Sequence, residues 1–121
     1  MRNPLLTIAV DRSGDHLVVR AAGEIDMGTA PDLAAALSDA VTAAPAPATI
    51  VADFTAVGFL GSAGLSVLVT AHHRGQRAGV RLAVVCPRDG LARRAFEISG
   101  LDHLLTVADT LDQALQPQDT P

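Results

Sequence analysis

A serine among small residues is the best-placed position in this chain to do chemistry. Ser62 lies in the segment Gly61-Ser62-Ala63-Gly64, directly after a strand-like apolar run and directly before a helix-like one. Ser is a preferred helix cap, because its oxygen accepts from the free N–H groups of a first turn. Those same N–H groups favour an anion, and open α/β sheets place their sites at such strand-to-helix turns. The segment therefore allows a structural cap, a catalytic nucleophile or an anion-bearing site.

A serine nucleophile is disfavoured by motif and by distance. The elbow motif Gly-x-Ser-x-Gly needs a glycine where this chain has Leu60. His72 and His73 are candidate bases, but both lie on the helix that Ser62 begins, about 15 Å further along it. His103 is a third candidate with no supporting spacing. A small serine hydrolase therefore stays a remote alternative.

The other reactive side chains predict no metal, nucleotide or redox site. Neighbouring helix positions point about 100° apart, so His72 and His73 cannot easily share a metal, and no further ligands stand at workable spacing. We expect His72 to lie at the boundary of the core. No glycine-rich phosphate loop is present, so we expect no cofactor. The single cysteine, Cys86, cannot form an internal disulfide and is expected to be a small buried hydrophobe.

The composition indicates one globular domain with an aliphatic core. The chain has 121 residues, of which 49% are hydrophobic and only 2% aromatic. The net charge is −4, and the pair Arg93-Arg94 is expected to be a solvated helix face. Without aromatic platforms or a basic patch, a nucleic-acid partner is not expected. No apolar run approaches the roughly 18 to 20 residues that span a bilayer, and no signal sequence is evident, so we expect a cytoplasmic protein without a membrane partner.

The chain alternates strand-like and helix-like segments. Strands are predicted over 5–12, 16–25, 48–54, 80–86 and 103–108, and helices over 30–43, 62–79, 89–100 and 110–116. This order predicts an α/β fold: a mixed, mostly parallel sheet of about five strands, four helices and an N-terminal β-hairpin. We expect a single domain over 1–121, with its core at about 5–115 and a frayed tail over 116–121.

Local signals set the ends and the buried faces of these elements. Ser13-Gly14-Asp15 reads as the hairpin turn, Thr29 and Thr110 as helix caps, and Gly79 and Gly100 as helix stops. Apolar residues at helical spacing predict the buried faces of the four helices: Leu33, Leu37 and Val41; Leu65, Leu68 and Val69; Leu91, Ala95 and Ile98; Leu111, Ala114 and Leu115.

Several ordered segments resemble a known family. They are GEIDMGTAPDLAAAL, VADFTAVGFLGSAGLSVLV and GVRLAVVCPRDGLARRAFEISGLDHLLTVADTLDQAL. Together they resemble the STAS domain of bacterial anti-sigma factor antagonists, over roughly Leu5 to Leu115. That family's key loop reads Asp-Ser-[Ser/Ala/Thr]-Gly-Leu, with the serine phosphorylated. Four residues match, Ser62 to Leu65, whereas Gly61 stands where the family has Asp.

The resemblance implies a regulatory binding protein and not an enzyme. An unphosphorylated antagonist binds an anti-sigma factor that is also a serine kinase, and so releases a sigma factor. The kinase phosphorylates the loop serine with its own ATP and dissociates, and a serine phosphatase restores the active form. The resemblance therefore implies that Ser62 is the switch and that no small-molecule substrate is needed.

The expected partner surface is the start of the Ser62 helix together with the Asp26 loop. Asp26 matches an acidic position that the family places beside the phosphorylated loop, and Asp53 matches a strand-end Asp of the family. A turn or capping role remains open for Asp26, and loop hydrogen bonding for Asp53, because Asp commonly serves both. The predicted partner and switch residues are Asp26, Gly61, Ser62, Ala63, Gly64, Ser66, Val67 and Thr70, with Asp53 supporting.

Gly61 leaves two hypotheses open, because it removes a carboxylate beside the hydroxyl. In one, Ser62 is still phosphorylated, and the smaller local negative charge makes the phosphorylated state easier to form. In the other, the switch is lost and the domain is a STAS-like scaffold that binds without regulation by phosphorylation.

Overall fold

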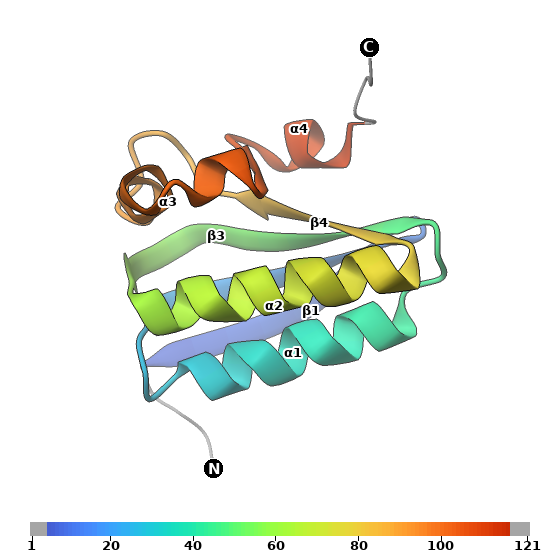
Figure 1. The fold of residues 1–121 in the computed structure, drawn as a ribbon, viewed down its shortest axis with the longest axis horizontal. Helices are drawn as coiled ribbons and strands as arrows, with labels where there is room; N and C mark the ends of the chain where they lie inside the picture. Colours follow the sequence, from blue (N-terminus) through green and yellow to red (C-terminus); the bar gives the residue numbers. More distant parts are fainter. Residues whose placement is uncertain (1–4, 117–121) are drawn as a thin grey trace.

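The computed structural model describes residues 5–116, which form one five-stranded sheet covered by helices (Figure 1). In chain order the elements are β1 (Leu6–Ser13), β2 (His16–Ile25), α1 (Ala30–Ala43), β3 (Ala48–Leu60), α2 (Ser62–Ala78), β4 (Val80–Val85), α3 (Arg93–Ser99), a 3₁₀ turn (Leu101–His103), β5 (Thr106–Ala108) and α4 (Leu111–Leu115). The strands lie side by side in the order β1-β2-β3-β4-β5. Only β1 and β2 are antiparallel. The predicted fold class is confirmed.

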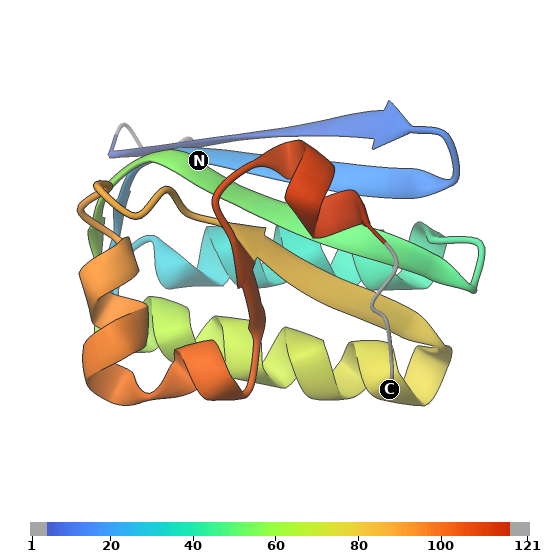
Figure 2. The ribbon, with the colours of Figure 1, turned by 90° about the horizontal axis from the view of Figure 1, so that it is seen from above.

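The helices form two unequal layers on the sheet. Figure 1 shows α1 and α2 side by side on one face, and Figure 2 shows α4 crossing the opposite face. The main core lies under α1 and α2, where Leu33, Leu37 and Leu68 are fully buried against strand residues. A smaller core under α4 contains Val51 and Ala114. Helix α2, which begins at Ser62, therefore lies in the larger helical layer, with its outer side at the surface of the molecule.

Most of the local signals act as predicted. Gly14, Gly79 and Gly100 adopt positive φ angles of 61°, 73° and 76°, which favour glycine, and they end the strand or helix before them. The Thr110 hydroxyl caps α4 by accepting from the Gln113 N–H at 3.2 Å. Thr29 is the N-cap residue of α1, as predicted, but its hydroxyl makes no capping hydrogen bond. The hydroxyl instead closes the preceding loop: it accepts from the Asp26 N–H and donates to the Glu24 carbonyl, both at 2.9 Å.

Strand β3 is longer than the sequence predicts. Its pairing with β4 ends at Asp53, but its pairing with β2 continues to Leu60, opposite Ile25. The alternation of apolar residues weakens after Phe54, so the sequence shows no strand there, while a partner strand still supplies hydrogen bonds. The longer strand brings residue 60 directly to the start of α2.

The predicted buried face of α3 is wrong. Leu91 and Ile98 are 76% and 74% exposed, whereas Ala92 and Phe96 are buried. The helix begins only at Arg93, so it is short enough that one aromatic side chain decides which face turns inward. Arg93 is also not solvated: its guanidinium donates to the Cys86 carbonyl at 2.7 Å and to Asp109 at 3.1 Å.

The predicted C-terminal tail mostly falls outside the described residues. Gln116 closes α4 as its C-cap residue, and 117–121 lie beyond the described range, as do 1–4. The last predicted strand is shortened to Thr106–Ala108, because Leu101–His103 form a 3₁₀ turn.

Cys86 is buried as predicted, and this makes its chemistry testable. Burial raises the pKa of its thiol from 9.0 to about 11, although the nearby Arg93 charge opposes the rise. We therefore expect iodoacetamide to alkylate Cys86 very slowly at pH 8 in the folded protein and rapidly in urea, measured by intact mass. Because the folded protein disfavours the thiolate, this group's contribution to stability should be lost between pH 9 and about 11. Equal labelling rates with and without urea would contradict the buried position.

Candidate functional site

Two loops that are far apart in the sequence leave the same edge of the sheet. Strands β2 and β3 run parallel and end side by side, with Ile25 opposite Leu60. The Gly61 N–H donates to the Ile25 carbonyl at 2.9 Å, which ties the start of α2 to the end of β2. The Asp26 loop and the Ser62 segment therefore emerge as neighbours, as their predicted shared role requires.

Ser62 is the first residue of α2 and is exposed. The N-cap position belongs to Gly61, so the hydroxyl lies one residue too late to cap, and the capping interpretation of Ser62 is wrong. Within the described part of the chain, that hydroxyl has no hydrogen-bond partner. The first turn of α2 also carries no acidic residue. An acceptor hydroxyl thus lies at a helix N-terminus whose dipole favours negative charge.

Gly61 and Gly64 have different physical reasons to be glycine. Gly61 is extended (φ −90°, ψ 177°), a conformation open to any residue, but a Cβ there would lie 3.2 Å from Cε2 of the Phe59 ring. That ring is 52% exposed, so it has room to shift. At Gly64 a Cβ would lie 2.5 Å from Ile25 Cγ2 and 2.6 Å from Leu60 Cδ1. Only glycine at position 64 lets the first turn of α2 pack directly on the strand ends.

The Asp26 carboxylate organises its own loop. Its Oδ1 accepts from the backbone N–H groups of Gly28 at 2.9 Å and Thr29 at 3.0 Å. Met27, between Asp26 and Gly28, is 84% exposed at the tip of the loop. The turn interpretation of Asp26 is therefore correct, and the loop beside Ser62 is held in one shape.

We expect Asp26→Ala to lower the free energy of unfolding by about 1–2 kcal/mol, because the two hydrogen bonds that the carboxylate accepts from backbone N–H groups are lost. Urea denaturation followed by circular dichroism measures the loss. Asp32→Ala is the matched control: Asp32 is exposed in the first turn of α1 and should cost only a few tenths of a kcal/mol. Equal losses in the two variants would show that the Asp26 hydrogen bonds do not stabilise the loop.

Asp53 does not lie at the strand end where it was predicted. Because β3 runs on to Leu60, roughly 20 Å of strand separate Asp53 from the start of α2. Its Oδ1 accepts from the Thr55 hydroxyl at 2.6 Å and the Thr55 N–H at 3.0 Å, and its Oδ2 lies 3.6 Å from Arg20 Nε. Local hydrogen bonding explains this residue, and the structure does not bring it to the candidate site.

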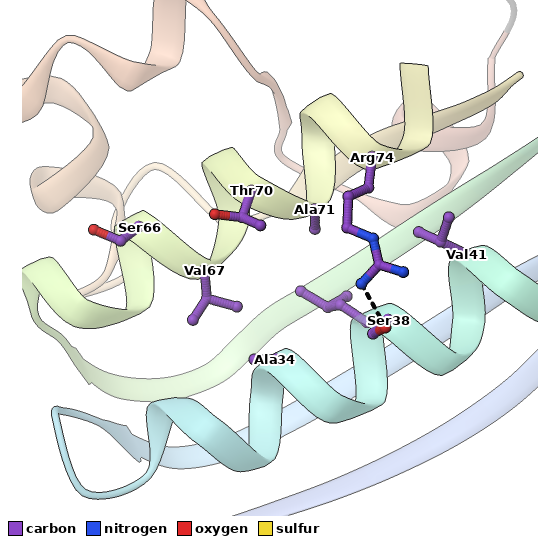
Figure 3. A pocket seen from close by; sticks show the side chains of 9 residues that line it. Ala34, Ser38, Val41, Ser66, Val67, Thr70, Ala71 and Arg74 are labelled. Carbon is purple, nitrogen blue, oxygen red and sulfur yellow. Dashed lines mark hydrogen bonds between the residues drawn. The ribbon is translucent and has the colours of Figure 1, made fainter. Parts of the chain in front are cut away.

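A groove between α1 and α2 begins about one turn beyond Ser62 (Figure 3). Its volume is about 220 Å³. Figure 3 shows Ser66, Val67 and Thr70 on the α2 side, three of the predicted partner residues, and an Arg74–Ser38 hydrogen bond of 2.6 Å that bridges the helices. The remaining lining residues are Ala34, Leu37, Val41 and Ala71.

Sequence reasoning missed the α1 side of this groove. Ala34 and Ser38 are one turn apart on α1, and the small Ala71 faces them from α2. Small residues at helical spacing on two helices were the available signal, but they could not reveal which helices would become neighbours.

The other candidate groups form no second site. His72 is half-buried at the core boundary, as predicted, and burial together with its neighbour His73 lowers its pKa. No group of three or more His, Cys, Asp or Glu among residues 5–116 could hold a metal ion. None of the helices in that range is long and apolar enough to cross a membrane.

Comparison with known proteins supports one family. A model of the STAS domain matches residues 7–114. The anti-sigma-F factor antagonist RsfB of Mycobacterium tuberculosis is 37% identical over 111 residues, covering 91% of this chain and 87% of that protein. The crystal structure of an anti-sigma factor antagonist from Mycobacterium paratuberculosis superposes with a TM-score of 0.77 at 35% identity, covering 95% of this chain and 96% of that one.

A more distant structure shares the fold alone. The anti-sigma factor antagonist SpoIIAA of Bacillus, in its unphosphorylated form, has a TM-score of 0.70 at 22% identity, covering 89% of this chain and 92% of that one. The matching family model, the close relative and the shared architecture agree with one another. The chain therefore belongs to the STAS domain family, the family of the bacterial anti-sigma factor antagonists that its sequence resembles.

Proposed function

We propose that this protein is an anti-sigma factor antagonist that is switched at Ser62. In the unphosphorylated state it binds an anti-sigma factor serine kinase and so frees a sigma factor. The observation that carries this proposal is the Ser62 hydroxyl, which is exposed and unpartnered in the described structure at the N-terminus of α2. The names of the relatives, RsfB and the Mycobacterium paratuberculosis protein, support the antagonist role.

The binding surface consists of the Ser62 segment, the Asp26 loop and the groove behind them. Residues 61–64 carry little side-chain bulk, so a partner backbone can approach closely. Ser66 and Thr70 offer hydroxyl groups, and Val67 offers an apolar contact. Such a surface suits a close, mostly uncharged contact, which an added phosphate would disturb strongly.

Phosphorylation would act on binding and not on folding. A phosphoryl group adds about −1.5 to −2 charges at pH 7. At a helix N-terminus these charges are stabilised by the dipole and by free N–H groups, so α2 stays folded. The same charge and bulk stand in the middle of the partner surface, where they repel or block a bound protein.

This chain supplies only the acceptor in the transfer step. The Ser62 oxygen attacks the γ-phosphorus of ATP held by the kinase, the bond from that phosphorus to the bridging oxygen breaks, and ADP leaves. The hydroxyl proton passes to a base of the kinase. A serine phosphatase reverses the modification with water, which releases phosphate and restores the hydroxyl.

Gly61 keeps the second candidate open, a STAS-like scaffold without phosphorylation. Restoring the carboxylate with Gly61→Asp should reduce the fraction of Ser62 that is phosphorylated after a fixed time with the kinase and ATP, because negative charge then opposes the incoming phosphate. Phosphate-affinity electrophoresis measures that fraction, and Gly61→Asn is the neutral control of equal size. An unchanged fraction in the aspartate variant would show that the missing carboxylate does not set the extent of phosphorylation.

The proposal is tested by capture from an extract of the native host, with ATP or ADP added. Mass spectrometry should identify an ATP-binding anti-sigma kinase on the wild-type protein, and with ATP should find phosphate on Ser62 and loss of the complex. A captured anti-sigma kinase with Ser62 unmodified under both nucleotides would favour the scaffold. Capture of no anti-sigma factor at all would overturn the antagonist function.

A further inference from the structure

Strand β1 forms an open edge of the sheet (Figure 2). It is eight residues long, Leu6–Ser13, and it pairs with β2 on one side only. Natural proteins protect edge strands with proline, charged side chains, bulges or a covering segment. Along β1 there is no proline and no bulge, the charged residues are Asp11 and Arg12 near one end, and no described segment pairs with its outer side. The uncharged stretch from Leu6 to Val10 is therefore a regular edge that can template another strand.

The pairing within the hairpin shows which backbone groups point outward. Ser13 and His16 flank the two-residue turn and form a hydrogen-bonded pair. Along the hairpin away from the turn, hydrogen-bonded pairs alternate with pairs that are not hydrogen-bonded. The Glu24 N–H donates to the Leu5 carbonyl at 2.8 Å, which agrees with this alternation. Thr7, Ala9 and Asp11 therefore bond to β2. The outward N–H and C=O groups belong to Leu6, Ile8, Val10 and Arg12.

The outward residues are self-complementary. All four outward residues have even numbers. In an antiparallel pair of β1 strands, outward residues lie opposite one another only if the two-fold axis passes through a residue and not between two residues. Centred on Ala9, Ile8 of each copy lies opposite Val10 of the other, and Thr7 lies opposite Asp11. Apolar side chains then meet, Asp11 faces a hydroxyl, and no like charges are opposed.

A side-chain surface accompanies this edge. Val10 is 53% exposed despite being apolar. It opens onto a groove of about 480 Å³ between β1 and α1, whose other lining residues are Ile8, Arg12, Leu17, Ala36, Asp39, Ala40 and Ala43. The alanines keep α1 narrow here, so a second copy of the same surface can approach across a two-fold axis.

We propose that β1 pairs antiparallel with β1 of a second copy about a two-fold axis at Ala9, which joins two five-stranded sheets into one continuous sheet. The dimer buries Val10 and satisfies the outward backbone groups of both copies. It leaves Ser62 exposed, because α2 lies over the interior of the sheet and not over β1. The inference is independent of the proposed function.

Sedimentation velocity over a wide range of protein concentration tests the proposal. The wild type should shift from monomer to dimer as its concentration rises. Val10→Lys should raise the dimer dissociation constant by more than about tenfold, because it puts a charge at an apolar seam. Leu91→Lys, a matched apolar-to-lysine change at an exposed position outside β1 and its groove, should leave it unchanged. A wild type that stays monomeric throughout, or a dimer equally tight in both variants, would overturn the proposal.

Hydrogen exchange in the wild type gives a second readout that needs no variant. Amides of Thr7, Ala9 and Asp11 should be protected at every concentration, because they bond within the hairpin. Amides of Ile8 and Val10 should gain protection only at concentrations where the dimer forms. Protection that does not alternate in this way would place the second copy elsewhere and refute edge pairing.

Discussion

Ser62→Asp is expected to weaken binding of the anti-sigma kinase by at least about 100-fold while the protein remains folded. A fixed negative charge at an interface that lacks a matching cation costs several kcal/mol of binding free energy. The charge lies at the N-terminus of α2, where the helix dipole stabilises it by about 0.3–1 kcal/mol, so stability should not fall. Isothermal titration with the kinase captured from the host measures the affinity, and thermal unfolding measures the stability.

Two other substitutions of Ser62 separate the effect of charge from the effects of size and of the acceptor oxygen. Ser62→Asn has nearly the same shape as the aspartate without its charge, and it should keep most of the affinity. Ser62→Ala should bind as the wild type does but should stay bound when ATP is added, because it lacks the acceptor oxygen. If the aspartate and asparagine variants bound equally, charge at Ser62 would not be the switch, and the scaffold would become the better description.

Gly64→Ala is expected to lower the free energy of unfolding by about 1–3 kcal/mol, the usual cost of overpacking a filled core. Glycine-to-alanine changes within helices ordinarily stabilise by about 0.5–1 kcal/mol, so the sign of the effect is diagnostic. Here the new methyl would lie 2.5 Å from Ile25 and 2.6 Å from Leu60, both of them buried side chains at strand ends. Urea denaturation measures the change.

Gly58→Ala is the control for this prediction. It lies in β3, shortly before the strand end at Leu60, but a Cβ there meets nothing within 4 Å, so the change should be nearly neutral. A double-mutant cycle with Ile25→Ala adds a second check, since removing the Ile25 side chain should reduce the cost of Gly64→Ala. Stabilisation by Gly64→Ala in the wild-type background would show that α2 does not pack on the strand ends as described.

The predictions for Ser62 and Gly64 are linked, because Gly64 determines where the Ser62 segment lies. Gly64 allows α2 to start directly on the ends of β2 and β3, and that start places Ser62 beside the Asp26 loop. A bulkier residue at 64 should therefore also weaken partner binding, by moving the Ser62 segment. The glycine that matters most for structure is two residues from the serine that matters most for the proposed switch.

Sequence reasoning placed Ser62 correctly between a strand and a helix, but it misjudged the roles of the residues around it. The small residues and their place between strand and helix are local facts, so they could be recognised directly. Whether Ser62 or Gly61 caps α2 depends on where β3 ends, and that depends on its pairing with β2. Asp53 was placed at a strand end for the same reason, and the longer strand moves it away from the site.

The sequence by itself determined the order of the elements, the hairpin and the C-terminal ends of α2 and α3. These depend on neighbouring residues: on hydrophobic periodicity, and on glycines at 14, 79 and 100 that adopt positive φ more readily than other residues. Only the tertiary structure decided how far β3 extends, that Phe96 is the buried side chain of α3, and that α1 and α2 enclose a groove. Each of these features depends on contacts between residues far apart in the chain. The energies of such contacts cannot be read from the pattern of neighbouring residues.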